Sequence, residues 1–264
     1  MARGVKSPAD LFMELASDSR CDILKTIEKQ KIRSTEIAKK LYLTVQETHR
    51  NTARLADAGI ITKDSEGFFL LTAFGKMIVQ NMDSFYFFNK HKKFFQNHSL
   101  GNLPKKFILQ ISALNNCKLI KGAFVINEEM TSVSTGGEYL KVISAHTPPD
   151  SFRATNELAK KGRKAMVVYG KNTIMPDSVK KEMKTPAVRK LILDGIRQHK
   201  MIERVPIFLV VNNQKGLVVF PDLKNDIDLN FGFVGTDAEF LEWCHDYHQY
   251  VWEHANEFDI SLLD

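Results

Sequence analysis

Cysteine is scarce in this sequence of 264 residues. Its three cysteines, Cys21, Cys117 and Cys244, lie far apart and form no C-x-x-C pair. A disulfide framework or a cysteine zinc site needs paired or closely spaced cysteines, so neither organises this fold. We expect a protein of the reducing cytoplasm. An apolar fraction of 44% supports sizeable cores, and the length allows two domains of common size.

Long apolar runs are also missing. The sequence has no stretch of about 18 or more apolar residues, which is the minimum for a membrane-spanning helix. Residues 1–8 contain no apolar block of the signal-peptide type. We therefore expect neither a membrane partner nor a secretion signal.

The motifs that mark common catalytic sites are absent. The sequence contains no H-E-x-x-H, no G-x-S-x-G and no Walker glycine loop. Cys244 and His248 are spaced four residues apart on a predicted helix, and His245 and His254 are nearby. This group could hold a metal if another residue supplied a further ligand. They also fall on the apolar stripe of that helix, which makes packing the simpler interpretation. We expect no metal, no cofactor and no enzymatic activity.

Charge is distributed unevenly along the chain. Residues 1–99 contain 16 Lys+Arg and 11 Asp+Glu, a balance of +5, whereas residues 100–264 contain 21 and 20, a balance of +1. A basic N-terminal module attached to a nearly neutral body suits a polyanionic partner. Many proteins that never bind nucleic acid have a similar balance, so the charge supports this interpretation without establishing it.

The stretch from Thr44 to Gly59 has the pattern of a recognition helix. Thr44 suits the N-cap, and Gly59 suits the left-handed residue that often follows a helix. Thr48, Thr52 and Leu55 are spaced to face a core. The opposite face carries long polar side chains, Gln46, His49, Arg50 and Arg54. An ordinary amphipathic surface helix would show the same pattern, so the neighbouring elements decide.

Those neighbouring elements follow the order of a winged helix-turn-helix. Helices are predicted from Ser7-Pro8, from Ser17 or Asp18 to about Lys29, and from Ser34 or Thr35 to about Leu41. After Gly59, the hairpin Ile60–Lys63, Asp64–Gly67 and Phe68–Leu71 would form the wing, and Thr72 would begin a helix that ends near Asn81.

This order assigns DNA-binding roles to named side chains. Gln46, His49 and Arg50 would read base edges in the major groove, with Glu47 on the same stretch. Phosphates would be bound by Thr44, Arg54, Lys63 of the wing, and the helix N-terminus at Thr35. We predict tight binding by two copies, that is, a homodimer on a (pseudo)palindromic duplex.

Residues 84–97 are rich in aromatic side chains, which we expect at a domain junction or a dimer interface. The run Phe94-Phe95-Gln96-Asn97-His98-Ser99-Leu100-Gly101-Asn102-Leu103-Pro104, followed by Leu114, resembles the junction of an archaeal regulator family. That family joins an ArsR-like winged helix to the methanogenesis-regulator middle domain. Residues 66–75 resemble its passage from wing to helix, and the segment with Trp243 and Trp252 is also similar. The resemblance implies a transcription factor with a C-terminal sensor-like domain.

The remainder alternates apolar strands and helices, which predicts an α/β domain with a largely parallel sheet. Strands are expected within residues 118–126 and 139–144, at 165–169, in a hairpin at 207–220, and at 231–234. Helices are expected after Asn127, at about 150–161, from Pro186, and from Asp237. Ligands in such sheets bind beyond the carboxyl ends of strands. The side chains there, which would bind an effector, are Ser144, His146, Tyr169 and Asn212.

We therefore predict an α+β N-terminal winged helix-turn-helix over residues 1–82, a helical connector or dimerisation segment over 83–116, and an α/β domain over 117–264. The sheet pattern resembles phospholipase D, but a His-x-Lys motif in a strand is missing, so no catalysis is expected. The alternatives are an enzyme built on the α/β domain and a winged helix that binds protein instead of DNA.

Overall fold

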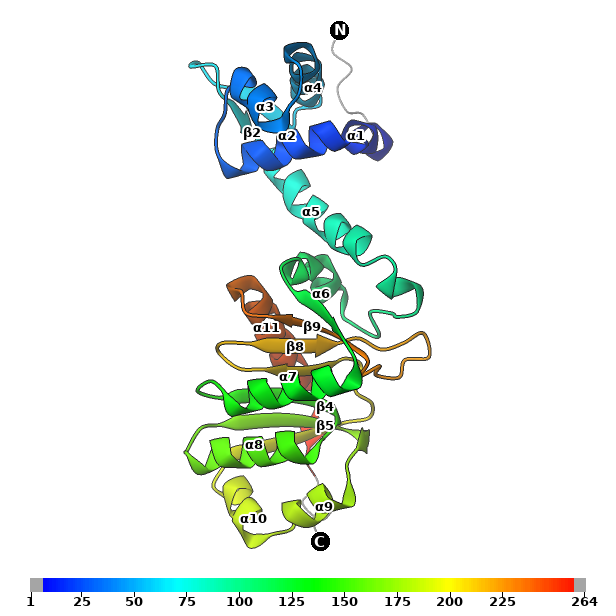
Figure 1. Cartoon of the computed structure of the whole chain (residues 1–264), viewed down its shortest axis with the longest axis vertical. Helices are drawn as coiled ribbons and strands as arrows, with labels where there is room; N and C mark the ends of the chain where they lie inside the picture. Colours follow the sequence, from blue (N-terminus) through cyan, green and yellow to red (C-terminus); the bar gives the residue numbers. More distant parts are fainter. Residues whose placement is uncertain (1–6, 259–264) are drawn as a thin grey trace. The chain divides into compact units, whose positions relative to one another are not determined.

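The computed structural model describes residues 7–258. The chain divides after residue 85 into two compact units (Figure 1). Residues 86–116 therefore belong to the second unit, and the separate connector expected at 83–116 is not a unit of its own. In this mixed α/β architecture, no helix of the described range is long and apolar enough to cross a bilayer.

The first unit has the element order expected of its sequence. Its elements are α1 (Pro8–Leu15), α2 (Asp18–Lys29), α3 (Ser34–Leu41), α4 (Val45–Asp57), β1 (Ile61–Lys63), β2 (Phe69–Leu71) and the start of α5 (Ala73–Lys90). The predicted caps Ser7, Ser17 and Thr44 each accept a backbone N–H of the first turn. Gly59 follows α4 with a φ of 73°, a conformation that glycine adopts without strain.

Two helix ends differ from the prediction. Arg33, and not Ser34 or Thr35, is the N-cap of α3, and its backbone N–H donates to Glu36 Oε2 at 3.0 Å. Helix α5 continues to Lys90 instead of ending near Asn81. Residues 81–90 contain neither glycine nor proline, so nothing in the backbone interrupts the helix there.

The second unit is built on an eight-stranded mixed sheet with the order β10-β6-β5-β4-β7-β8-β9-β3. Its strands are β3 (Lys118–Lys121), β4 (Leu140–His146), β5 (Ala165–Ile174), β6 (Arg197–Ile202), β7 (Phe208–Val211), β8 (Gly216–Val219), β9 (Phe231–Gly235) and β10 (Asn256–Glu257). Its helices are η1 (Phe94–Gln96), α6 (Lys105–Leu109), η2 (Ile111–Leu114), α7 (Ala123–Thr135), α8 (Pro149–Lys160), α9 (Asp177–Met183), α10 (Pro186–Leu193) and α11 (Ala238–His254).

The prediction of a largely parallel sheet is wrong. Within the described residues, the parallel pairings are β4 with β5 and β5 with β6, and the other named strands pair antiparallel. Hairpin connections such as β7–β8 are too short for the crossover that parallel strands need. Helix α7 also begins at Ala123, after Gly122, and not at Asn127.

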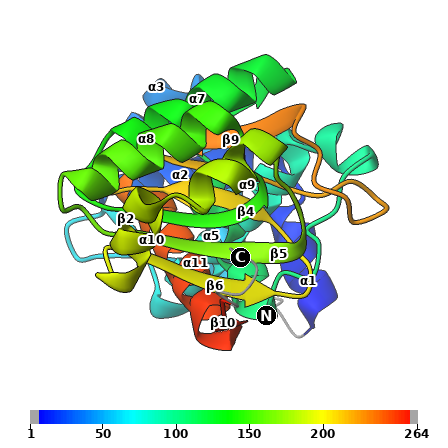
Figure 2. The same ribbon diagram turned by 90° about the horizontal axis from the view of Figure 1, so that it is seen from below.

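Helices cover both faces of the sheet (Figure 2). Helices α7 and α8 lie side by side on one face, and α11 lies on the other. Strand β7 shows how alternation divides the core: Phe208 and Val210 pack with Met130 of α7, whereas Leu209 and Val211 pack with Cys244 of α11. The α11 side of the core also receives Phe87, Phe94, Phe107, Phe220 and Phe233.

Candidate nucleic-acid interface

Helix α4 is fixed to the first unit through one buried face. Leu55 is fully buried in the core beside Ile37 of α3. The Thr48 hydroxyl donates to the Thr44 carbonyl at 3.0 Å, and the Thr52 hydroxyl donates to the Thr48 carbonyl at 2.9 Å, so two polar residues are buried without unsatisfied groups. The inward face predicted for this helix is confirmed.

The opposite face of α4 presents Gln46, His49 and Arg50 to solvent. Because these positions are three and four residues apart, they project from the same side of the helix. Their side chains combine an amide, an imidazole and a guanidinium. All three can donate hydrogen bonds to base-edge acceptors, and arginine can do so bidentately to guanine.

The sequence predicts that Arg54 is free to bind DNA like these three side chains. In the structure it is instead paired with Glu14. Its Nε donates to Glu14 Oε2 at 2.9 Å and its Nη2 to Glu14 Oε1 at 2.8 Å. The hydrogen bond from Arg54 and the charges of Arg54 and Arg20 lower the pKa of Glu14, against the effect of burial. The fork of Arg54 is therefore occupied within the protein, and a phosphate would have to displace a bidentate carboxylate.

Thr44 and Glu47 are likewise engaged with each other. The Thr44 hydroxyl accepts from the Glu47 backbone N–H at 3.1 Å and donates to Glu47 Oε2 at 2.8 Å. The Thr44 backbone N–H also donates to Glu47 Oε2, at 3.0 Å. These bonds from Thr44 lower the pKa of Glu47. The pair forms a capping box, so its contribution here is to begin the helix, and the contacts of both side chains with DNA stay predictions.

The two remaining predicted phosphate contacts lie on the β1–β2 hairpin and at the start of α3. Lys63 is exposed, and its Nζ lies 5.6 Å from the Phe69 ring centroid across the hairpin. Thr35 is exposed in the first turn of α3. Both predicted phosphate contacts are therefore accessible, and neither is tied to a carboxylate in the described part of the chain.

Sequence reasoning missed three residues at this surface. Arg33 precedes α3 and lies over the Phe68 ring of the wing at 4.5 Å, so its cation is held by an aromatic face. Tyr42, in the turn between α3 and α4, is 96% exposed, and Val45, the first residue of α4, is 71% exposed. Tyr42 is the C-cap of α3, with a φ of 54°, and the sequence signal for it is its place in the short turn before Thr44.

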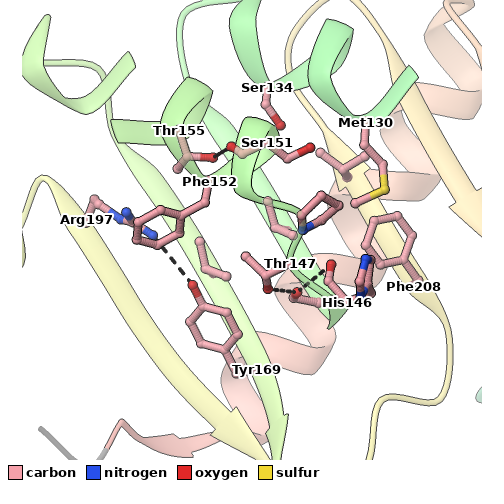
Figure 3. Close-up of a pocket in the computed structure, with 15 residues that line it drawn as sticks. Met130, Ser134, His146, Thr147, Ser151, Phe152, Thr155, Tyr169, Arg197 and Phe208 are labelled. Atoms are coloured by element: carbon pink, nitrogen blue, oxygen red, sulfur yellow. Dashed lines mark hydrogen bonds between the residues drawn. The ribbon is translucent and has the colours of Figure 1, made fainter. Parts of the chain in front are cut away.

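The predicted effector residues are only partly brought together (Figure 3). Ser144, His146 and Tyr169 line one cavity beside α8, of about 30 Å³, which is room for little more than water. The Ser144 and Thr147 hydroxyls lie 2.9 Å apart within it. Burial lowers the pKa of His146. This cavity, as it stands, cannot hold an organic effector.

Asn212 lies at the opposite end of the sheet, because β7 runs antiparallel to β4 and Val211 pairs with Lys141. Its amide closes the β7–β8 turn: Nδ2 donates to the Val133 carbonyl at 2.7 Å, and Oδ1 accepts from the backbone N–H groups of Gln214 and Lys215. Asn212 therefore does not lie beside Ser144, and its amide holds the turn.

Cys244 and His248 are buried on the inner face of α11. His248 Nε2 lies 3.2 Å from the Met166 carbonyl, and burial is the main reason that its pKa is lowered to about 3. Burial also raises the pKa of the Cys244 thiol. Within residues 7–258, no group of three or more His, Cys, Asp or Glu is arranged to hold a metal ion.

In sequence comparison, no family model and no curated protein matches the chain. Among solved structures, the archaeal chromatin protein TrmBL2, whose structure is described as showing a novel mode of DNA binding, is similar over 90% of this chain and 92% of its own, with 10% identity and a TM-score of 0.42. The phospholipase D family member Nuc from Salmonella typhimurium matches 54% of this chain and 97% of its own, with 12% identity and a TM-score of 0.38. NucT from Helicobacter pylori matches 54% and 99%, with 14% identity and a TM-score of 0.40. These are distant likenesses of fold.

Proposed function

We propose that this protein is a DNA-binding transcriptional regulator whose winged helix-turn-helix places α4 in the major groove of duplex DNA. The observation that carries the proposal is the outer face of α4, where Gln46, His49 and Arg50 are all exposed on one side. The helix joins α3 by a short turn and is followed by the β1–β2 hairpin, which is the order of elements in this motif.

The contacts divide by chemistry. Gln46, His49 and Arg50 read base edges, which specify sequence, while Lys63 and the α3 N-terminus at Thr35 contact phosphates, which fix position. Arg33, held on the Phe68 ring, adds a phosphate contact beside the wing. Three base-reading side chains give limited discrimination, so we propose that two copies bind together.

Exposed apolar side chains of the first unit are candidates for the pairing surface. Phe12 and Met13 of α1 are 58% and 64% exposed, and Met77 of α5 is 56% exposed. Aromatic side chains and methionine are enriched at protein interfaces. We propose that a second copy covers them. The Met77→Glu variant should sediment as a monomer at concentrations where the Lys76→Glu control remains a dimer.

The test of the proposed function is selection of binding sites from a random duplex pool with the full-length protein. The proposal predicts enrichment of a sequence with two related half-sites, and binding that weakens steeply with salt. Enrichment of no sequence, together with salt-insensitive binding, would favour the alternative of a protein-binding winged helix.

A further inference from the structure

A second cavity of about 640 Å³ lies where β5 ends. It is bounded by Tyr169, Gly170, Lys171 and Thr173 of β5, by α9 and the residue after it, and by Met201 of β6. Its volume falls within the range of pockets that bind small molecules. It is far larger than the hydroxyl-lined cavity beside α8, with which it shares the Tyr169 side chain.

The floor of this cavity is apolar and deformable. Met175, Met183 and Met201 line it together with the rings of Tyr169 and Phe258, whose centroids are 5.9 Å apart. Methionine side chains are flexible and polarisable, so they adapt to a hydrocarbon body without a fixed shape. Tyr169 and Met183 are themselves almost fully buried, which anchors the floor in the core.

The rim carries positive charge from separate elements: Lys171 on β5, Lys180 on α9 and Lys184 just after α9. Among the residues of the described chain that line the cavity, none is an aspartate or glutamate. Lys171 pairs with Glu203 at 2.8 Å, and Lys180 pairs with Asp177 at 3.6 Å. All four of these side chains are more than half exposed, and exposed pairs of this kind are weak enough to exchange for a ligand.

The charge behind the floor has the same sign. The hydroxyl of Tyr169 lies 3.5 Å from Arg197 Nη2, and Arg197 is 1% exposed. Its guanidinium is held by the Asn156 amide and the Phe152 ring, and within residues 7–258 no carboxylate lies within ion-pair distance of it. Asn156 in turn bonds to Glu182, so this charge is only partly balanced.

From this combination we infer a binding site for a small organic anion with a hydrocarbon body, in which the lysines hold the anionic group and the methionine and aromatic floor holds the chain. This inference does not rest on the proposed DNA binding, because all the lining residues belong to the second unit. A neutral molecule with the same hydrocarbon body would contact only the floor. A short anion would contact only the lysines of the rim.

The test is isothermal titration of the full-length protein with decanoate. Decanol and butyrate serve as probes that lack the charge and the long body, respectively. We expect decanoate to bind, and decanol and butyrate each to bind at least about tenfold more weakly. The double variant Lys180→Glu/Lys184→Glu should weaken decanoate binding by about tenfold or more, because it reverses the rim charge.

Lys181→Glu is the control, since it makes one Lys-to-Glu reversal on α9 outside the residues that line the cavity, half the charge change of the double variant. Its decanoate affinity should stay within about twofold of the parent. Circular dichroism checks that all variants fold. Absence of decanoate binding by the folded parent, equal binding of decanol, or an equal loss in Lys181→Glu would each overturn the inference.

Discussion

Glu14 of α1 and Arg54 of α4 form a bidentate ion pair, with N–O distances of 2.9 and 2.8 Å. The pair joins α1 to α4 across 40 positions of sequence. Arg20 adds a third charge, 3.7 Å from Glu14 Oε2, and its Nη2 donates to the Met13 carbonyl at the end of α1. The arrangement orients α4, and it leaves Arg50 as the arginine of that helix that faces solvent freely.

Removing this carboxylate should destabilise the first unit. For Glu14→Gln we expect the free energy of unfolding to fall by about 0.5–1 kcal/mol, as for a partly exposed pair. The pKa of Glu14 is lowered in the folded state, so its contribution is present above the ordinary pKa of a glutamate and is lost as pH falls through the lowered value. Urea titrations at neutral and acidic pH measure both effects.

The matched control for that measurement is Asp22→Asn, which removes an exposed carboxylate of α2. It should change the unfolding free energy by less than about 0.5 kcal/mol. A loss of equal size in both variants would mean that the ion pair contributes no specific stability.

The wing lysine should affect the salt dependence of binding more than its sequence preference. We expect Lys63→Ala to weaken binding to all duplexes by a similar factor and to reduce the slope of log K against log salt by about one. Mobility-shift titrations at several salt concentrations, on a selected and a scrambled duplex, measure this. A loss confined to the selected duplex would instead assign Lys63 to base reading.

The aromatic run after the first unit should contribute core stability. Phe87 is fully buried with its ring centroid 5.7 Å from that of Phe233, whereas Phe85 is 61% exposed. We expect Phe87→Ala to cost about 3–5 kcal/mol in thermal or chemical unfolding. Phe85→Ala should stay within about 0.5 kcal/mol of the parent. Equal effects of the two would contradict the placement of this segment.

Buried histidines should make the second unit sensitive to acid. Folding lowers the pKa of His248 from 6.5 to about 3, mainly by burial, and burial also lowers that of His199. Below pH 6.5 the unfolded chain takes up protons that the folded protein does not, so acid favours unfolding. For each such histidine, the free energy of unfolding should fall by up to about 1.4 kcal/mol for every pH unit below 6.5. Unfolding free energies that stay constant from pH 7 to 5 would be inconsistent with neutral, buried rings.

Local sequence signals predicted the first unit well because caps, turns and periodicity act within a few residues. Thr44, Gly59 and the Asp64–Gly67 turn each define an element end by their own chemistry. The occupancy of Arg54 could not be predicted, since its partner Glu14 lies on another helix and no local pattern joins the two.

The second unit was predicted less well because strand direction depends on tertiary pairing. Strand β6, Arg197–Ile202, is polar in sequence and was missed, although Arg197 and His199 are buried in the structure. The antiparallel course of β7 moved Asn212 away from Ser144. The cavity is lined by β6 and α9, neither of which was predicted, so its lysines could not be grouped from sequence.

The most direct test of the central claim is the affinity of the full-length Arg50→Ala variant for its selected duplex, compared with the parent and with Arg153→Ala, an exposed arginine of α8. The account predicts a loss of about 1–3 kcal/mol for Arg50→Ala, with relaxed preference at one base pair of each half-site, and no loss for Arg153→Ala. An unchanged affinity and preference for Arg50→Ala in a mobility-shift titration would show that α4 does not read the duplex.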